Sequence, residues 1–120
     1  MKNINGEIEY KDKVYKIVFN LNVMEQIQDE YGSLDKWREL TEGKDGSEPN
    51  IKAVKFGFTA MLNEAIDIEN DENQGTGIKP IQPLTKNFVG RMLTDIGLRE
   101  MANKLHKTVT ESTQSTEKNA

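Results

Sequence analysis

The sequence contains no cysteine and only one histidine. The lack of cysteine excludes disulfide bonds, thiolate metal sites and cysteine nucleophiles. No apolar run approaches the ~18 residues that a membrane-spanning helix requires, so we expect no such helix. The first seven residues also lack the apolar segment of a secretory signal. Together, these features predict a cytoplasmic protein.

A strong excess of one charge is missing as well. The 120 residues include 16 basic and 20 acidic side chains, for a net charge of −4. Four acidic residues in the base-free stretch 67–77 account for this balance: Asp67, Glu69, Asp71 and Glu72. The rest of the chain is neutral and has no field to steer it onto nucleic acid, so nucleic-acid binding is disfavoured.

The first segment alternates between apolar and polar residues. Ile8 and Tyr10 form one run, and Tyr15, Ile17 and Phe19 form the next, with three charged residues at 11–13 between them. A period of two with β-branched and aromatic residues predicts two strands joined as a hairpin. Because an isolated hairpin is only marginally stable, one face is expected to pack on the rest of the chain.

Helical periodicity follows the hairpin. Asn22 and Glu25 have the spacing of a capping box at the start of a helix that ends at Gly32. Ser33 is placed to cap a short second helix that runs to residue 42.

The widest apolar stripe covers residues 50–66, which predicts the central helix. Gly57 within it predicts either the close approach of a neighbouring backbone or a break in the helix. Residues 67–83 lack periodicity and are expected to form an exposed loop. A last helical region covers 85–106 and is interrupted at Gly97.

The end of the chain is polar. From Lys107 onward, Val109 is the only large apolar residue, so residues 107–120 are expected to form a disordered tail. Residues 1–106 are then one domain, which suits the length of the chain. The predicted fold is mainly α (α+β), with an N-terminal β-hairpin packed on a bundle of four to five short helices.

No residue pattern indicates an enzyme or a bound cofactor. No set of catalytic or metal-binding residues accompanies His106 in the sequence, so it is interpreted as a solvated residue at a helix end. The acidic stretch does not match a calcium-binding loop in either of two registers. Counted from Asp67, Glu72 stands at the sixth position, where the loop needs glycine, and counted from Asp71, Gly75 stands at the fifth position, where it needs a ligand side chain. We therefore predict no catalytic, metal-binding or cofactor-binding residues.

The short second helix carries Leu34, Trp37 and Leu40 on one side. An ordinary core position is one interpretation of Trp37, the only tryptophan. The other is a contact with a partner protein, since aromatic residues are enriched at interface hot spots and a short helix has little room to bury an indole. These three residues are our predicted partner-binding site.

The order of the predicted elements resembles that of a known family. A hairpin leads into a helix that ends in Glu-Tyr-Gly-Ser-Leu at residues 30–34, followed by a short helix, a long apolar helix, a polar loop and a helix that Leu84-Thr85 opens. Over residues 4–106, this order resembles the tail assembly chaperones of long-tailed bacteriophages of Gram-positive hosts. Its most specific piece is Tyr31-Gly32-Ser33-Leu34.

The resemblance implies a non-enzymatic helper in virion assembly, located in the cytoplasm of the bacterial host and absent from the mature virion. Its implied partners are the tape measure protein and the tail tube protein, and it implies rings or spirals of copies. Such chaperones are often made in two lengths by ribosomal frameshifting. Two other interpretations stay open: a small structural or connector protein of the virion, and a regulatory protein-binding module of a mobile element.

Overall fold

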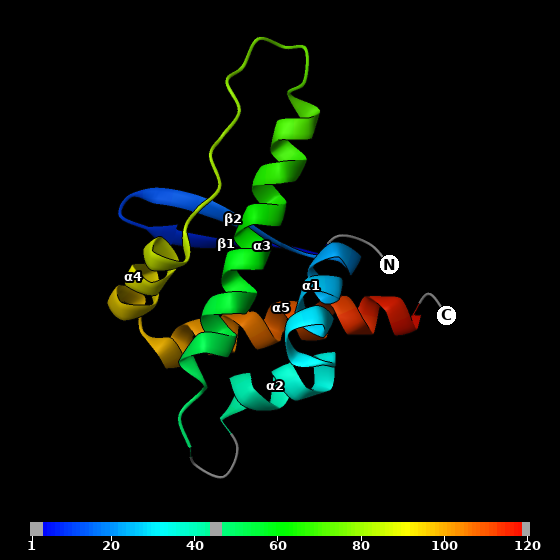
Figure 1. Ribbon diagram of the computed structural model, residues 1–120, viewed down its shortest axis with the longest axis vertical. Coiled ribbons are helices and arrows are strands. Elements are labelled where there is room, and N and C mark those ends of the chain that lie inside the picture. Colours follow the sequence, from blue (N-terminus) through cyan, green and yellow to red (C-terminus); the bar gives the residue numbers. More distant parts are fainter. Residues whose placement is uncertain (1–3, 44–46, 119–120) are drawn as a thin grey trace.

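The computed structural model describes residues 4–43 and 47–118 (Figure 1). It confirms the predicted α+β fold, with an antiparallel hairpin packed against helices. The elements in chain order are β1 (Ile4–Tyr10), β2 (Lys13–Phe19), α1 (Leu21–Tyr31), α2 (Leu34–Glu42), α3 (Ile51–Glu72), α4 (Lys86–Ile96) and α5 (Leu98–Lys118).

The hairpin turns through two residues, Lys11 and Asp12, which have φ of 51° and 62°. Positive φ at both central residues matches the right-handed twist of the two strands, which favours a tight hairpin. Tyr10 lies opposite Lys13, and Ile8 lies opposite Tyr15. Ile8, Tyr10 and Ile17 on one face are buried, so the hairpin packs on the helices through this face, as its alternation predicts.

The long helix α3 is the centre of the fold. It contacts β2 and all four other helices (Figure 1). Asn50 caps its start by accepting a hydrogen bond from the backbone N–H of Ala53 at 2.9 Å. Val54, Phe58 and Met61 are fully buried along it. The prediction of a central helix from residue 50 is confirmed.

The start of α1 differs from the prediction. Asn20, not Asn22, caps the helix, and its side-chain oxygen accepts from the N–H of Val23. The side-chain amides of Asn20 and Asn22 both donate to Glu64 Oε2 in α3, at 2.6 and 3.0 Å. Asn22 therefore ties α1 to the central helix, which a local capping rule cannot reveal.

The predicted loop 67–83 is wrong over its first six residues, because α3 continues to Glu72. The four acidic residues at 67–72 are exposed on its last turns. Asn70, on the same turns, pairs with the backbone of Ile81, so a long-range contact supports this part of the helix.

The helix α5 begins after Gly97, as predicted, but it runs through the expected tail to Lys118. Thr108 and Val109 are buried, the latter with only 1% of its surface exposed. Their positions continue the stripe of Ala102 and Leu105 at helical spacing, so the predicted boundary at residue 107 is too early. Residues 119–120 of the expected tail lie outside the described residues.

Candidate protein-binding surface

The predicted partner-binding site on α2 does not form a surface. Trp37 is completely buried, and its indole Nε1–H donates to the backbone carbonyl of Ala53 at 2.9 Å. Leu34 is half-buried against the core, and 40% of Leu40 is exposed. The core interpretation of Trp37 holds, and the three residues do not come together as a contact patch.

Gly57 explains how a nine-residue helix buries a tryptophan. A Cβ atom at Gly57 would lie 2.5 Å from Trp37 Cζ2 and 3.1 Å from Leu105 Cδ1. Ala53, which accepts the indole hydrogen bond, is one turn earlier on the same face of α3. The missing side chain thus provides the space for the ring, and the predicted close neighbour of Gly57 is a side chain rather than a backbone.

His106 is also placed differently from its prediction. It lies well inside α5, is half-buried, and its Nε2 is 2.9 Å from Thr41 Oγ1 in α2. Burial is the main cause that lowers the pKa of His106 below its usual value of 6.5. Of the charged neighbours, Glu42 raises this pKa and Arg38 lowers it. His106 is therefore a link between two helices and not a solvated helix end.

Acidic side chains do not gather into a metal site within residues 4–43 and 47–118. No group of three or more His, Asp or Glu side chains there is close enough to share an ion. No helix of the same residues is both long and apolar enough to cross a membrane.

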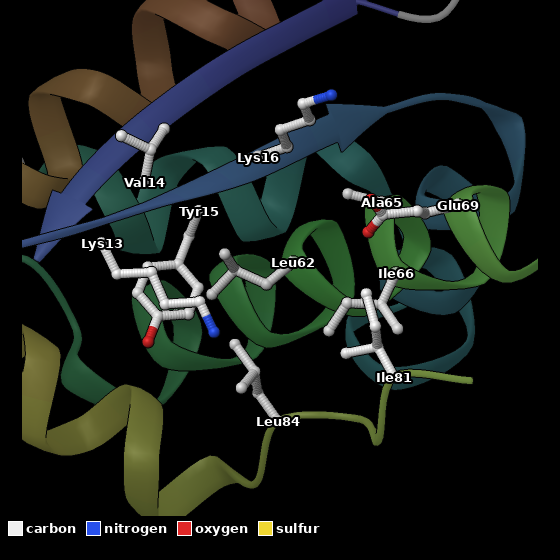
Figure 2. A pocket seen from close by; sticks show the side chains of 10 residues that line it. All are labelled: Lys13, Val14, Tyr15, Lys16, Leu62, Ala65, Ile66, Glu69, Ile81 and Leu84. Atoms are coloured by element: carbon white, nitrogen blue, oxygen red, sulfur yellow. The ribbon is translucent and has the colours of Figure 1, made fainter. Parts of the chain in front are cut away.

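A groove lies between β2, the second half of α3 and the extended segment 81–84 (Figure 2). Tyr15, Leu62, Ile66, Ile81 and Leu84 surround the hollow with apolar atoms. Its volume is about 160 Å³, below the roughly 300–1,000 Å³ of typical small-molecule pockets. This size suits side chains of another protein better than a cofactor.

The groove runs along the edge of β2. Four consecutive residues of the strand line it, from Lys13 to Lys16. Successive side chains of a strand point to opposite faces, so a hollow bounded by consecutive residues follows the edge of the strand and not one face. Within residues 4–43 and 47–118 the sheet has two strands, so no described strand lies beside this edge of β2.

Two asparagines of α3 fix the opposite wall of the groove. Asn63 donates to the carbonyl of Leu84 at 3.1 Å and accepts from its N–H at 2.8 Å. Asn70 makes the same pair with Ile81, at 3.0 and 2.9 Å. Asn63 and Asn70 are seven residues apart and therefore share a face of α3, so the segment is held in place against the helix.

The rim of the groove combines exposed apolar groups with positive charge. Val14 is 54% exposed and Ile81 is 42% exposed. Lys13 and Lys16 are exposed on β2, whereas Glu69 is the acidic residue of the lining. An open apolar hollow with a charged rim is the arrangement expected where another protein binds.

Sequence reasoning missed this surface. The edge of β2 follows from the hairpin prediction, but its far wall depends on Asn63 and Asn70, which resemble ordinary polar positions on a helix. The one available signal was their spacing of seven, opposite the segment Pro80-Ile-Gln-Pro-Leu84. Comparison with protein-family models, with curated proteins and with solved structures found no match to this chain.

Proposed function

We propose that this protein is a non-enzymatic tail assembly chaperone of a long-tailed bacteriophage or prophage of a Gram-positive host. It binds the tape measure protein and recruits the tail tube protein in the host cytoplasm, and it is absent from the mature virion. The groove along β2 is the observation that carries the binding role, because it leaves apolar side chains and a strand edge open to a partner.

The order of elements supports the choice of family. The resemblance implies a hairpin, a helix, a short helix, a long apolar helix, a polar connection and a final helical region. The chain has these elements in this order, from β1 to α5. The agreement concerns architecture, and the partners come from the resemblance.

The physical requirement for such a helper comes from its partner. A tape measure protein is expected to be long and amphipathic, and its apolar stripes face water until the tube surrounds them, which favours aggregation. A chaperone must cover the stripes and later release them. Contacts near or below ~1,200 Å² are typical of such transient encounters, and the small groove suits one contact per copy among many copies.

Co-expression tests the proposal. The tape measure protein of the same genome is produced alone and with this chain, and its soluble fraction is measured. We expect this chain to raise the soluble fraction and to co-purify with the tape measure protein. An equal soluble fraction in both cultures would contradict the chaperone function.

Immunoblots of purified virions separate the two other interpretations. A chaperone is present in the infected-cell lysate and absent from particles, whereas a connector protein is present in particles at a fixed copy number. A regulatory module leaves tail assembly unchanged when its gene is deleted. Light scattering over a concentration series tests the proposed self-association, which requires a mass above 13.6 kDa.

A further inference from the structure

We propose that the groove along β2 takes one additional β-strand, supplied by an extended segment of a partner protein with alternating apolar and acidic side chains. The proposal goes beyond the assembly role, because it states how a partner is recognised whichever assembly the chain serves. It rests on the backbone of β2, on the apolar floor and on the charges of the rim.

The backbone of β2 has unused hydrogen-bonding groups along the groove. The two-residue turn makes Tyr10 and Lys13 the first hydrogen-bonded pair, and such pairs alternate along an antiparallel ladder. Val14 and Lys16 occupy the positions between them, so their N–H and C=O groups point away from β1. Among the described residues, neither makes a backbone hydrogen bond to a segment outside the hairpin.

The two walls of the groove differ in what they offer. On the far wall, the N–H and C=O groups of Ile81 and Leu84 are already paired with the side chains of Asn70 and Asn63. At these two residues the far wall therefore contributes apolar side chains, whereas β2 offers main-chain groups for pairing. A strand added there extends the sheet over α3, the arrangement known as β-augmentation.

The floor of the groove determines which side chains the added strand needs. Figure 2 shows Tyr15 pointing toward α3, while Val14 and Lys16 point to the opposite face of β2. An added strand alternates in the same way, so every second side chain meets Leu62 and Ile66 and must be apolar. The side chains between them lie on the outer face, beside Val14 and Lys16.

The charges of the rim select an acidic partner. On the outer face Lys16 lies opposite Glu7 of β1. An acidic side chain of the added strand would lie on the other side of Lys16, so the lysine would have a negative charge on each side. Lys13 adds a second positive charge at the turn end of the groove. Lys13 shares the inner face with Tyr15 (Figure 2), so Lys16 is the lysine that an acidic side chain on the outer face of an alternating segment complements.

A second copy of the chain fits this edge less well. Pairing β2 with β2 of another copy would place the lysines of both copies along one interface, and like charges side by side are destabilising. The other edge of the hairpin, on β1, faces α5 and lines a hollow with it. A segment from a different protein is therefore the favoured occupant.

Amide hydrogen exchange measured by NMR on the full chain tests the proposal. The probe is an acetylated and amidated eight-residue peptide of alternating valine and glutamate, and the control peptide has lysine in place of glutamate. At ~90% occupancy we expect exchange of the Val14 and Lys16 amide hydrogens to slow about tenfold. The lysine peptide should bind about threefold to tenfold more weakly than the glutamate peptide.

Charge variants complete the test. Lys16→Glu should weaken binding of the glutamate peptide about threefold to tenfold, and Lys16→Gln should weaken it less. Lys36→Glu makes the same change on α2, away from the groove, and should leave affinity unchanged. Melting curves of the three variants confirm that each one is folded.

Three results would overturn the proposal. The first is no saturable binding of the glutamate peptide at millimolar concentration. The second is binding without added protection at Val14 and Lys16. The third is protection of these two amides in the free protein that increases with its concentration, which would mean that a second copy already occupies the edge.

Discussion

Replacing Gly57 with alanine tests the packing of the core most sharply. Glycine inside a helix costs about 1 kcal/mol relative to alanine, so the substitution would stabilise an unhindered helix. Here the new Cβ would lie 2.5 Å from Trp37 Cζ2 and 3.3 Å from Cε2. The indole cannot move away freely, because it is completely buried and hydrogen-bonded to the Ala53 carbonyl.

The size of the effect follows from two opposing contributions. Overpacking of a core costs ~1–3 kcal/mol, and a contact this short with a fixed ring belongs in the upper half of that range. Subtracting the gain of about 1 kcal/mol in helix propensity leaves a net loss of about 1–2 kcal/mol for Gly57→Ala. In a Trp37→Phe background the smaller ring relieves the clash, so the same substitution should cost less.

Gly90 in the interior of α4 provides a matched control. A Cβ there meets only Lys55 Cδ at 3.6 Å and Nζ at 3.8 Å, which are ordinary contacts with a flexible side chain. Gly90→Ala should therefore raise the stability by about 0.5–1 kcal/mol. Urea unfolding followed by circular dichroism measures both variants, and a stabilising Gly57→Ala would refute the proposed packing of Trp37.

Three further predictions concern the groove wall, α5 and pH. Asn63→Ala and Asn70→Ala each remove two hydrogen bonds to the 81–84 segment. Urea unfolding should show the larger loss of unfolding free energy, ~1–3 kcal/mol, for Asn63→Ala, because Asn63 is partly buried. Equal losses for the two variants would contradict this difference in burial. Val109→Ala should cost ~1.5–2 kcal/mol if its burial in α5 is correct, and an unchanged melting temperature would restore the predicted boundary at residue 107. Because burial lowers the pKa of His106 below 6.5, the unfolded chain binds the proton more readily, so stability should fall as pH decreases through about 6.5. Thermal unfolding at several pH values should show that loss for the wild type and less of it for His106→Gln, and equal pH dependence would contradict the assignment.

The sequence predicted the elements well because their signals are local. Alternation over residues 8–19 identified the hairpin, and the side chains of Ser33 and Thr85 indeed accept from the backbone at the starts of α2 and α4. Errors arose where a distant contact overrides a local pattern. Asn22 has the spacing of a cap but binds Glu64, and residues 67–72 look like a loop but form the end of α3.

The binding surface was harder to predict for the same reason. The shortness of α2 favours a partner contact as one of the two interpretations of Trp37, yet the space for its ring comes from Gly57 on another helix. Gly57 was recognised as a position that needs a close neighbour, but its sequence context does not identify that neighbour. The groove depends on pairing between residues 63 and 84 and between 70 and 81, which periodicity along one segment does not encode.

We propose that this chain keeps a partner soluble through the groove along β2. The most direct measurement is the soluble fraction of the tape measure protein co-expressed with wild type, Lys16→Glu or Lys36→Glu. We expect wild type and Lys36→Glu to raise this fraction equally and a folded Lys16→Glu to raise it less. Equal soluble fractions with Lys16→Glu and Lys36→Glu would contradict the role of the groove.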